Sequence, residues 1–362
     1  MERICGGILS RRMLREFEPS PNPPDPDHAP IFIIGTGRSG TSLLRAMLNA
    51  HPRIHLASFY PWTEMPLPWV GGTRRLELYY ASFSFAWLGI DPRELRAAFP
   101  APVPRERFPD VLRAILRRVA ARHGKPRWGE KNPLNSLHLD RIFAAFPDAR
   151  VVRTVRDPRG TLDSYARMPF SCSSALFMRL TFRRGRRRLA PYLDRILTIR
   201  MEDLLADPRS KMAEVLAYVG EPWDEAVLDH AHHLPPDDGP PFPWVVDAYA
   251  PLDPRPPSWP RRLSPARIRL VERLNRRWMR LHGYEPTELV EEPTTWALAR
   301  EAAVDAVVGA RYMWRGGRYL RRLTGRRPLA AAEAQRRFLE LNPDPGARFL
   351  AGALPDPPAL PD

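Results

Sequence analysis

A glycine-rich octapeptide near the N-terminus carries residue types that bind anions. It reads Gly35-Thr36-Gly37-Arg38-Ser39-Gly40-Thr41-Ser42. Its end glycines match a G-x-x-x-x-G-K-[ST] phosphate loop, but Thr41 stands where that loop has its lysine. A glycine-rich turn that leads into a helix directs backbone N–H groups and the positive helix end at an anion. The loop therefore predicts phosphate binding without the lysine that reaches the β- and γ-phosphates of a nucleoside triphosphate.

A second group of anion-binding residue types follows a later apolar segment. Arg156 comes directly after that segment, and Ser164 follows eight residues later. If Asp157 caps a helix, Ser164 lies two turns further along the same face, so both side chains can converge on one phosphate. The alternative is that Arg156 pairs with Asp157 or Asp163 and that Ser164 is an ordinary helix residue.

Both motifs resemble those of the sulfotransferases that use 3′-phosphoadenosine 5′-phosphosulfate (PAPS), specifically the bacterial branch and the protein-tyrosine sulfotransferases. The resemblance covers about residues 30–285. It implies transfer of a sulfuryl group from PAPS to an acceptor hydroxyl of a small molecule, glycan or lipid. It also implies that Arg156 and Ser164 hold the 3′-phosphate. The residues that it implies for the 5′-phosphosulfate are Gly37, Arg38, Ser39, Gly40, Thr41 and Ser42.

The resemblance extends to groups that act on the transferring sulfuryl. The segment WGEKNP resembles a family segment whose lysine contacts that group, which implies this role for Lys131. Arg38 is the second implied catalytic group, since its planar fork of donors suits a pair of sulfuryl oxygens. An ordinary loop lysine is the alternative interpretation of Lys131. No metal is expected, because arginine and lysine stand where nucleotide kinases use Mg²⁺.

The general base has several candidates. Relatives carry a Gly-Glu pair about seven residues after the His-Pro that ends the first helix, and Ser58 and Phe59 stand there in this chain. Glu64, a few residues later, is the leading candidate for accepting the hydroxyl proton. His55 and Glu130 are alternatives, and so is a chain without a functional base. An inactive nucleotide-binding relative and a degenerate P-loop kinase are therefore the competing functions.

The motifs lie at the ends of short apolar runs that are typical of buried parallel strands. Strands are predicted at 31–34, 150–155 and 196–201. Helices are predicted at 42–50, 105–123, 134–146, 208–219 and 264–282. Strands that alternate with helices predict an α/β fold. We expect a three-layer sandwich with a central parallel sheet, close to the P-loop nucleotide-kinase arrangement.

The predicted organisation is one sulfotransferase-like catalytic domain at 31–288 with flanking segments. A proline-rich lead at 1–30 and a tail at 341–362 are expected to be disordered. Between domain and tail, a helical extension at 289–340 contains an Arg-rich amphipathic helix at 294–325. Such a helix packs on the domain as an ordinary surface helix or contacts an anionic membrane surface. Packing is the favoured interpretation.

Composition restricts partners and location. The 362 residues are 44% hydrophobic, so a sizeable core can form, and the net charge is +15. Only three of the 56 basic residues are lysines, and 43 residues are prolines, a bias typical of a GC-rich genome; nucleic acid is not predicted as a partner. Two cysteines and the lack of a long apolar run favour a cytoplasmic protein without a membrane span. The oligomeric state is not predicted.

Overall fold

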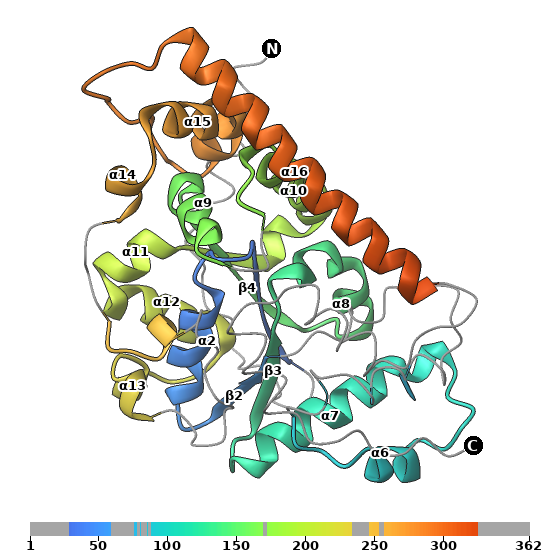
Figure 1. Cartoon of the computed structure of the whole chain (residues 1–362). Helices are drawn as coiled ribbons and strands as arrows, with labels where there is room; N and C mark the ends of the chain where they lie inside the picture. Colours follow the sequence, from blue (N-terminus) through green and yellow to red (C-terminus); the bar gives the residue numbers. More distant parts are fainter. Residues whose placement is uncertain are drawn as a thin grey trace.

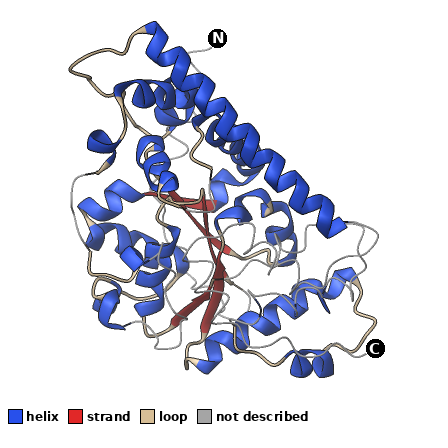
Figure 2. Ribbon diagram, viewed as in Figure 1, coloured by secondary structure: helices blue, strands red, loops and turns tan. Residues whose placement is uncertain are grey.

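Five parallel strands form a central sheet with helices on both faces (Figure 2). The computed structural model describes residues 29–58, 76–77, 80, 85, 88–168, 172–233, 246–252 and 257–324. The strands are β1 (Ile31–Gly35), β2 (Ile54–Ala57), β3 (Arg127–Lys131), β4 (Arg150–Val155) and β5 (Ile196–Arg200). Their order in the sheet is β2-β3-β1-β4-β5, which places β1 and its following loop in the centre.

The helices connect these strands and make the outer layers (Figure 1). They are α2 (Thr41–Ala50), α6 (Pro92–Ala98), α7 (Phe108–Arg122), α8 (Leu139–Ala145), α9 (Pro158–Ala166), α10 (Ala175–Leu189), α11 (Met201–Ala206), α12 (Pro208–Val219), α13 (His230–His233), α14 (Trp259–Arg262), α15 (Pro265–Leu281) and α16 (Thr295–Thr324). Helices α2 and α12 lie on one side of the sheet, and α7 and α8 lie on the other.

Strand β1 shows how the sequence builds the layers. Its side chains alternate between the two faces. Ile31 and Ile33 pack in the core beneath α2 and α12, whereas Phe32 and Ile34 pack in the core beneath α7 and α8. All four are fully buried, so an uninterrupted apolar run is what a strand covered on both faces requires. The three-layer α/β fold predicted from the sequence is confirmed.

Two strands and the division of one helix were not predicted. Strand β2 has four residues, and β3 (RWGEK) is polar although every residue in it is buried. The charge of Arg127 is balanced by Glu221 at 3.2 Å, which allows a basic residue inside the sheet. The helix predicted at 134–146 is a short 3-10 helix at Pro133–Leu137 followed by α8.

The long helix α16 packs on α10 and α15 through a buried carboxylate. Asp305 is 1% exposed and accepts hydrogen bonds from the Ser174 hydroxyl (2.8 Å) and from the N–H of Ala175 (2.7 Å). These groups belong to the first turn of α10, so a side chain of α16 caps another helix. Arg267 of α15 completes the contact with an ion pair to Asp305 at 2.8 Å. Within the described ranges, no helix is both long and apolar enough to span a bilayer.

Candidate functional site

The loop between β1 and α2 is held in shape by its own polar groups. The Ser39 hydroxyl donates to the carbonyl of Thr36 (2.6 Å) and lies 2.8 Å from the hydroxyl of Thr154 in β4. The Ser39 N–H also bonds the Thr36 carbonyl. Ser39 was predicted to bind the ligand, but its hydroxyl and its N–H group are both used in these internal contacts. Arg38 adopts a left-handed backbone with φ 64°, a strained conformation that is frequent at functional sites.

Two glycines of the loop are required by close approaches. A Cβ on Gly37 would overlap the hydroxyl of Tyr165, which lies against the loop from α9. Gly40 has φ 94°, and a Cβ there would overlap the sulfur of Met201. A side chain at either position would displace Tyr165 or Met201, and at position 40 it would also be strained by the left-handed backbone.

The N-terminus of α2 has no side-chain cap. Its N-cap residue is Gly40, so the first backbone N–H groups of the helix receive no bond from a cap side chain. Thr41 and Ser42 form the first helical positions, and Thr41 is 4% exposed. Uncapped N–H groups at a helix start attract an anion, and the partial positive charge of the helix end adds to the attraction.

Three of the predicted anion-binding residues lie together beside this loop. The Nε of Arg38 donates to the Ser164 hydroxyl at 2.9 Å, and Nη1 of Arg156 donates to the Arg38 carbonyl at 3.3 Å. Ser164 is 1% exposed in this arrangement. Burial lowers the pKa of Arg38, as does the nearby charge of Arg156, and burial also lowers the pKa of Arg156. Residues 126 positions apart in the chain therefore form one cationic group.

The acidic residues near Arg156 are bound to other partners. Asp157 caps α9, as predicted, by accepting from the N–H of Arg159. Its carboxylate also pairs with the Arg159 guanidinium at 2.6 Å, and Asp163 pairs with Arg262 at 2.9 Å. The alternative interpretation, in which Arg156 pairs with Asp157 or Asp163, is therefore wrong. Among the described residues, neither Arg156 nor Arg38 forms an ion pair.

Lys131 lies on the other side of the loop. It ends β3 and pairs in register with Ile33 of β1, so it lies one strand away from the loop, opposite to β4. Its Nζ is 3.4 Å from the Ser42 hydroxyl. Lys131 is thus the last residue of an inner strand and does not belong to an open loop. The predicted site comprises two contacts, Arg38 with Ser164 and Lys131 with Ser42, on either side of the phosphate-type loop.

The candidate bases differ in their surroundings. His55 in β2 is 2% exposed and stacks on His123, and burial lowers its pKa to about 2. Glu130 is fully buried, and burial raises its pKa well above the usual range. A buried imidazole with so low a pKa and a buried carboxyl that retains its proton are poor proton acceptors. Glu64, the leading candidate, lies outside the described residues.

Two residues that support the site were not found from the sequence. Tyr165 packs on Gly37, and burial raises its pKa to about 12. Glu202, at the start of α11, accepts from the N–H of Asp157 (2.9 Å) and from the hydroxyl of Tyr284 (2.7 Å). It fixes the turn that presents Arg156. Its position directly after a strand was a usable signal, but its partners lie far away in the sequence.

The fold and this site define an α/β protein with a glycine-rich, phosphate-type loop at the carboxyl edge of a parallel sheet. The model of the sulfotransferase family matches residues 30–225, which is more than half of the chain. The chain belongs to the sulfotransferase family. The match includes the loop, Lys131, Arg156 and Ser164.

Individual curated relatives of the chain are also named as sulfotransferases. The chain is similar to a protein-tyrosine sulfotransferase of Drosophila melanogaster, with 26% identity over 226 residues, which cover 59% of this chain and 42% of the relative. It is 27% identical over 211 residues to protein-tyrosine sulfotransferase 1 of Danio rerio, covering 55% of each chain. The chain thus spans about half the length of these curated relatives.

Solved structures of sulfotransferases also align with the chain. The sulfotransferase domain of the Synechococcus PCC 7002 olefin synthase aligns with 81% of this chain and 98% of its own, at 19% identity and a TM-score of 0.46. The sulfotransferase STF9 from Mycobacterium avium aligns with 72% of this chain and 78% of its own, at 16% identity and a TM-score of 0.39.

Proposed function

We propose that this chain transfers a sulfuryl group from PAPS to an acceptor hydroxyl. The observation that carries the proposal is the group of Arg38, Arg156 and Ser164 beside the uncapped start of α2. Half-buried cations without an ion pair among the described residues favour an anionic ligand. PAPS offers a 3′-phosphate and a 5′-phosphosulfate, which match the two places at which the family motifs stand.

In the proposed reaction, the acceptor oxygen forms a bond to sulfur while the bond between sulfur and the 5′-phosphate oxygen breaks. The hydroxyl proton passes to a base, for which Glu64 stays the proposal, and 3′,5′-adenosine bisphosphate leaves. Lys131 and Arg38 approach from opposite sides of the loop, and their proposed role is to donate to the sulfuryl and leaving oxygens. Arginine and lysine supply the positive charge that a metal ion supplies in nucleotide kinases.

The donor assignment is tested by calorimetric titration of the full chain with 3′,5′-adenosine bisphosphate, AMP and ATP in parallel. We expect the bisphosphate to bind at least about tenfold more tightly than AMP, because a charge-assisted contact contributes about 1.5–3 kcal/mol. Equal affinity for bisphosphate and AMP would overturn the assignment of PAPS. Tightest binding of ATP would instead support the degenerate P-loop kinase.

A catalytically inactive relative that binds the same nucleotide is the second candidate function. This second function is favoured by the surroundings of His55 and Glu130. Both candidate bases are buried and are unsuited to accept a proton. The discriminating experiment is the Glu64→Gln variant. If the chain is an enzyme with this base, the variant keeps nucleotide affinity and loses turnover of PAPS.

The proposed acceptor is a hydroxyl of a small molecule, glycan or lipid. The names of the relatives add a protein tyrosine to this range.

We also propose a cytoplasmic location, which rests on the small number of cysteines. Cys172, the one that lies in the described ranges, is a buried free thiol.

A further inference from the structure

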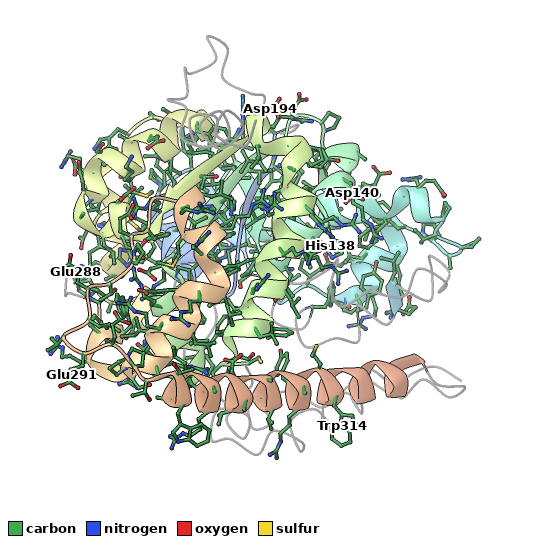
Figure 3. All side chains as sticks on the ribbon, turned by 90° about the horizontal axis from the view of Figure 1, so that it is seen from above. His138, Asp140, Asp194, Glu288, Glu291 and Trp314 are labelled. Atoms are coloured by element: carbon green, nitrogen blue, oxygen red, sulfur yellow. The ribbon has the colours of Figure 1, made fainter. Side chains whose placement is uncertain are left out.

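The outer face of α16 carries an apolar stripe that includes large exposed side chains. Its residues are Trp296, Ala303, Val307, Ala310 and Trp314. Successive spacings of 7, 4, 3 and 4 residues place them on one face of the helix. The exposed fractions of Trp296, Val307 and Trp314 are 74%, 66% and 56%. Figure 3 shows Trp314 on the side of α16 that points away from the body of the protein.

The inner face of the same helix fixes the orientation of this stripe. Asp305 lies nine residues after Trp296, which is half a turn away around the helix. Its buried hydrogen bonds to the first turn of α10 hold the inner face down. Tyr312 adds an edge-on ring contact with Phe177 of α10, with centroids 5.0 Å apart. The stripe is therefore the outward face of a docked helix and not the result of a detached segment.

Charge on the helix is distributed unequally between its faces. The two acidic residues of α16 are Glu301 and Asp305, and both are paired with Arg267 of α15, at 2.9 and 2.8 Å. Arg300 and Arg311 lie beside the stripe and are exposed. The sequence of α16 continues with four more arginines and no acid. The outward face is consequently apolar and cationic together.

We propose that the outer face of α16 docks on an anionic lipid bilayer, with the helix lying parallel to the membrane surface. Interfacial helices of this kind bury an apolar face among the headgroups while arginines pair with anionic lipids. The two tryptophans are about 27 Å apart along the helix axis, from a rise of 1.5 Å per residue. Indole rings prefer the headgroup region, so both ends of the stripe are suited to it.

Charge complementarity selects this occupant over a second copy of the chain. In a parallel pair of α16 helices, each arginine beside the stripe would lie opposite its own copy, and like charges at close range repel. An anionic surface receives the same arginines favourably. This proposal is independent of the identity of the sulfuryl donor and acceptor.

The proposal is tested by flotation of the full chain with vesicles. One set of vesicles contains phosphatidylcholine with phosphatidylglycerol, and the other contains phosphatidylcholine alone. We expect flotation with the anionic set and its loss at high salt. Val307→Glu should weaken partitioning at least about tenfold. It removes methyl groups that the proposed docking would bury among the lipid headgroups, and it adds a negative charge that anionic lipids repel. Arg300→Gln combined with Arg311→Gln should weaken it about 25-fold, at about fivefold for each arginine.

The matched control is Val290→Glu. Val290 is fully exposed but precedes α16, so this variant introduces the same charge outside the stripe. We expect it to float like the unchanged chain, and all variants to keep the same melting temperature. Absence of flotation with anionic vesicles would overturn the proposal, as would equal losses for Val307→Glu and Val290→Glu. A dimer that Val307→Glu converts to a monomer, without vesicle binding, would identify a second copy as the occupant instead.

Discussion

Buried arginines near the start of α9 have opposite surroundings. Arg159, at the start of α9, is 5% exposed and pairs with Asp157 at 2.6 Å and with Glu272 at 2.7 Å. Its guanidinium also lies over the ring of Trp259. Arg156, three residues earlier, and Arg38, in the phosphate-type loop, have no ion pair among the described residues. Arg156 donates to the carbonyl of Arg38, and Arg38 donates to the hydroxyl of Ser164.

We propose that this difference separates a structural charge from a ligand-binding charge. Removing a cation from water costs free energy, and Arg159 recovers it from two carboxylates. Arg38 and Arg156 carry the same cost, and each also lies in the repulsive field of the other or of Arg167. A fold tolerates such unbalanced charge where a ligand brings the opposite sign. The sequence predicted Arg38 and Arg156 as ligand-binding residues, and this role stays a prediction.

The largest expected effect is on stability and comes from Arg159→Met. This variant leaves the buried carboxylate of Asp157 without an ion pair among the described residues, which costs about 3–5 kcal/mol for a broken buried pair, while Glu272 keeps its second partner, Arg269, at 2.5 Å. We expect the free energy of unfolding, measured by urea denaturation, to fall by this amount. Arg156→Met is the control and should change it by much less. Equal losses for the two variants would erase the distinction between the two groups.

The next effect concerns binding and comes from Arg156→Ala. We expect the preference for 3′,5′-adenosine bisphosphate over AMP to shrink by about tenfold or more, since one charge-assisted contact with the 3′-phosphate is lost. The affinity for AMP itself should stay the same. Calorimetry of both nucleotides with the variant provides the measurement. A uniform loss for both would place Arg156 at the 5′ side.

Arg38→Ala should show the complementary pattern. Because its implied partner is the 5′-phosphosulfate, we expect both nucleotides to bind less tightly by about the same factor, tenfold or more. Without nucleotide, the melting temperature should be unchanged or slightly higher, because a cation that is repelled by Arg156 has been removed. Unfolding or aggregation of this variant would show that Arg38 is structural.

The sequence predicted the parts of the site that depend on local patterns. Glycines before a helix, and an Asp-Pro pair after an apolar run, located the loop and the start of α9 within a residue or two. Strand β3 was missed because charged residues occupy a buried strand, where Glu221, distant in the sequence, balances the charge of Arg127. The contact of Tyr165 with Gly37 and the cap that Asp305 gives to α10 are likewise products of folding, with partners more than 100 residues apart.

A third class of buried ionisable group extends the comparison, namely a carboxyl that is buried without an ion pair among the described residues. Glu130 is fully buried on β3, and no described residue makes a hydrogen bond of full geometry to either carboxyl oxygen, although the amides of Asn135 and Asn132 lie close to it. Burial raises its pKa well above normal, while the amides of Asn135 and Asn132 and the charge of Lys131 oppose the shift. The folded chain therefore holds this proton more tightly than the unfolded chain does. Glu130 avoids the cost of a buried charge by keeping its proton, whereas Arg159 offsets that cost with ion pairs.

The last expected effect is the pH dependence of stability that follows from Glu130. Because its pKa is higher in the folded than in the unfolded chain, its contribution is favourable below the unfolded value of about 4.3 and is lost as the pH rises toward the folded value. The loss is about 1.4 kcal/mol for each pH unit in that window. Glu130→Gln removes it, so the variant should gain stability relative to the unchanged chain as the pH rises. Urea denaturation across this range measures the difference, with Glu288→Gln, an exposed site at the edge of the molecule (Figure 3), as the control. If the curve for Glu130→Gln runs parallel to that of the control, Glu130 is ionised in the folded chain and a cation must balance it.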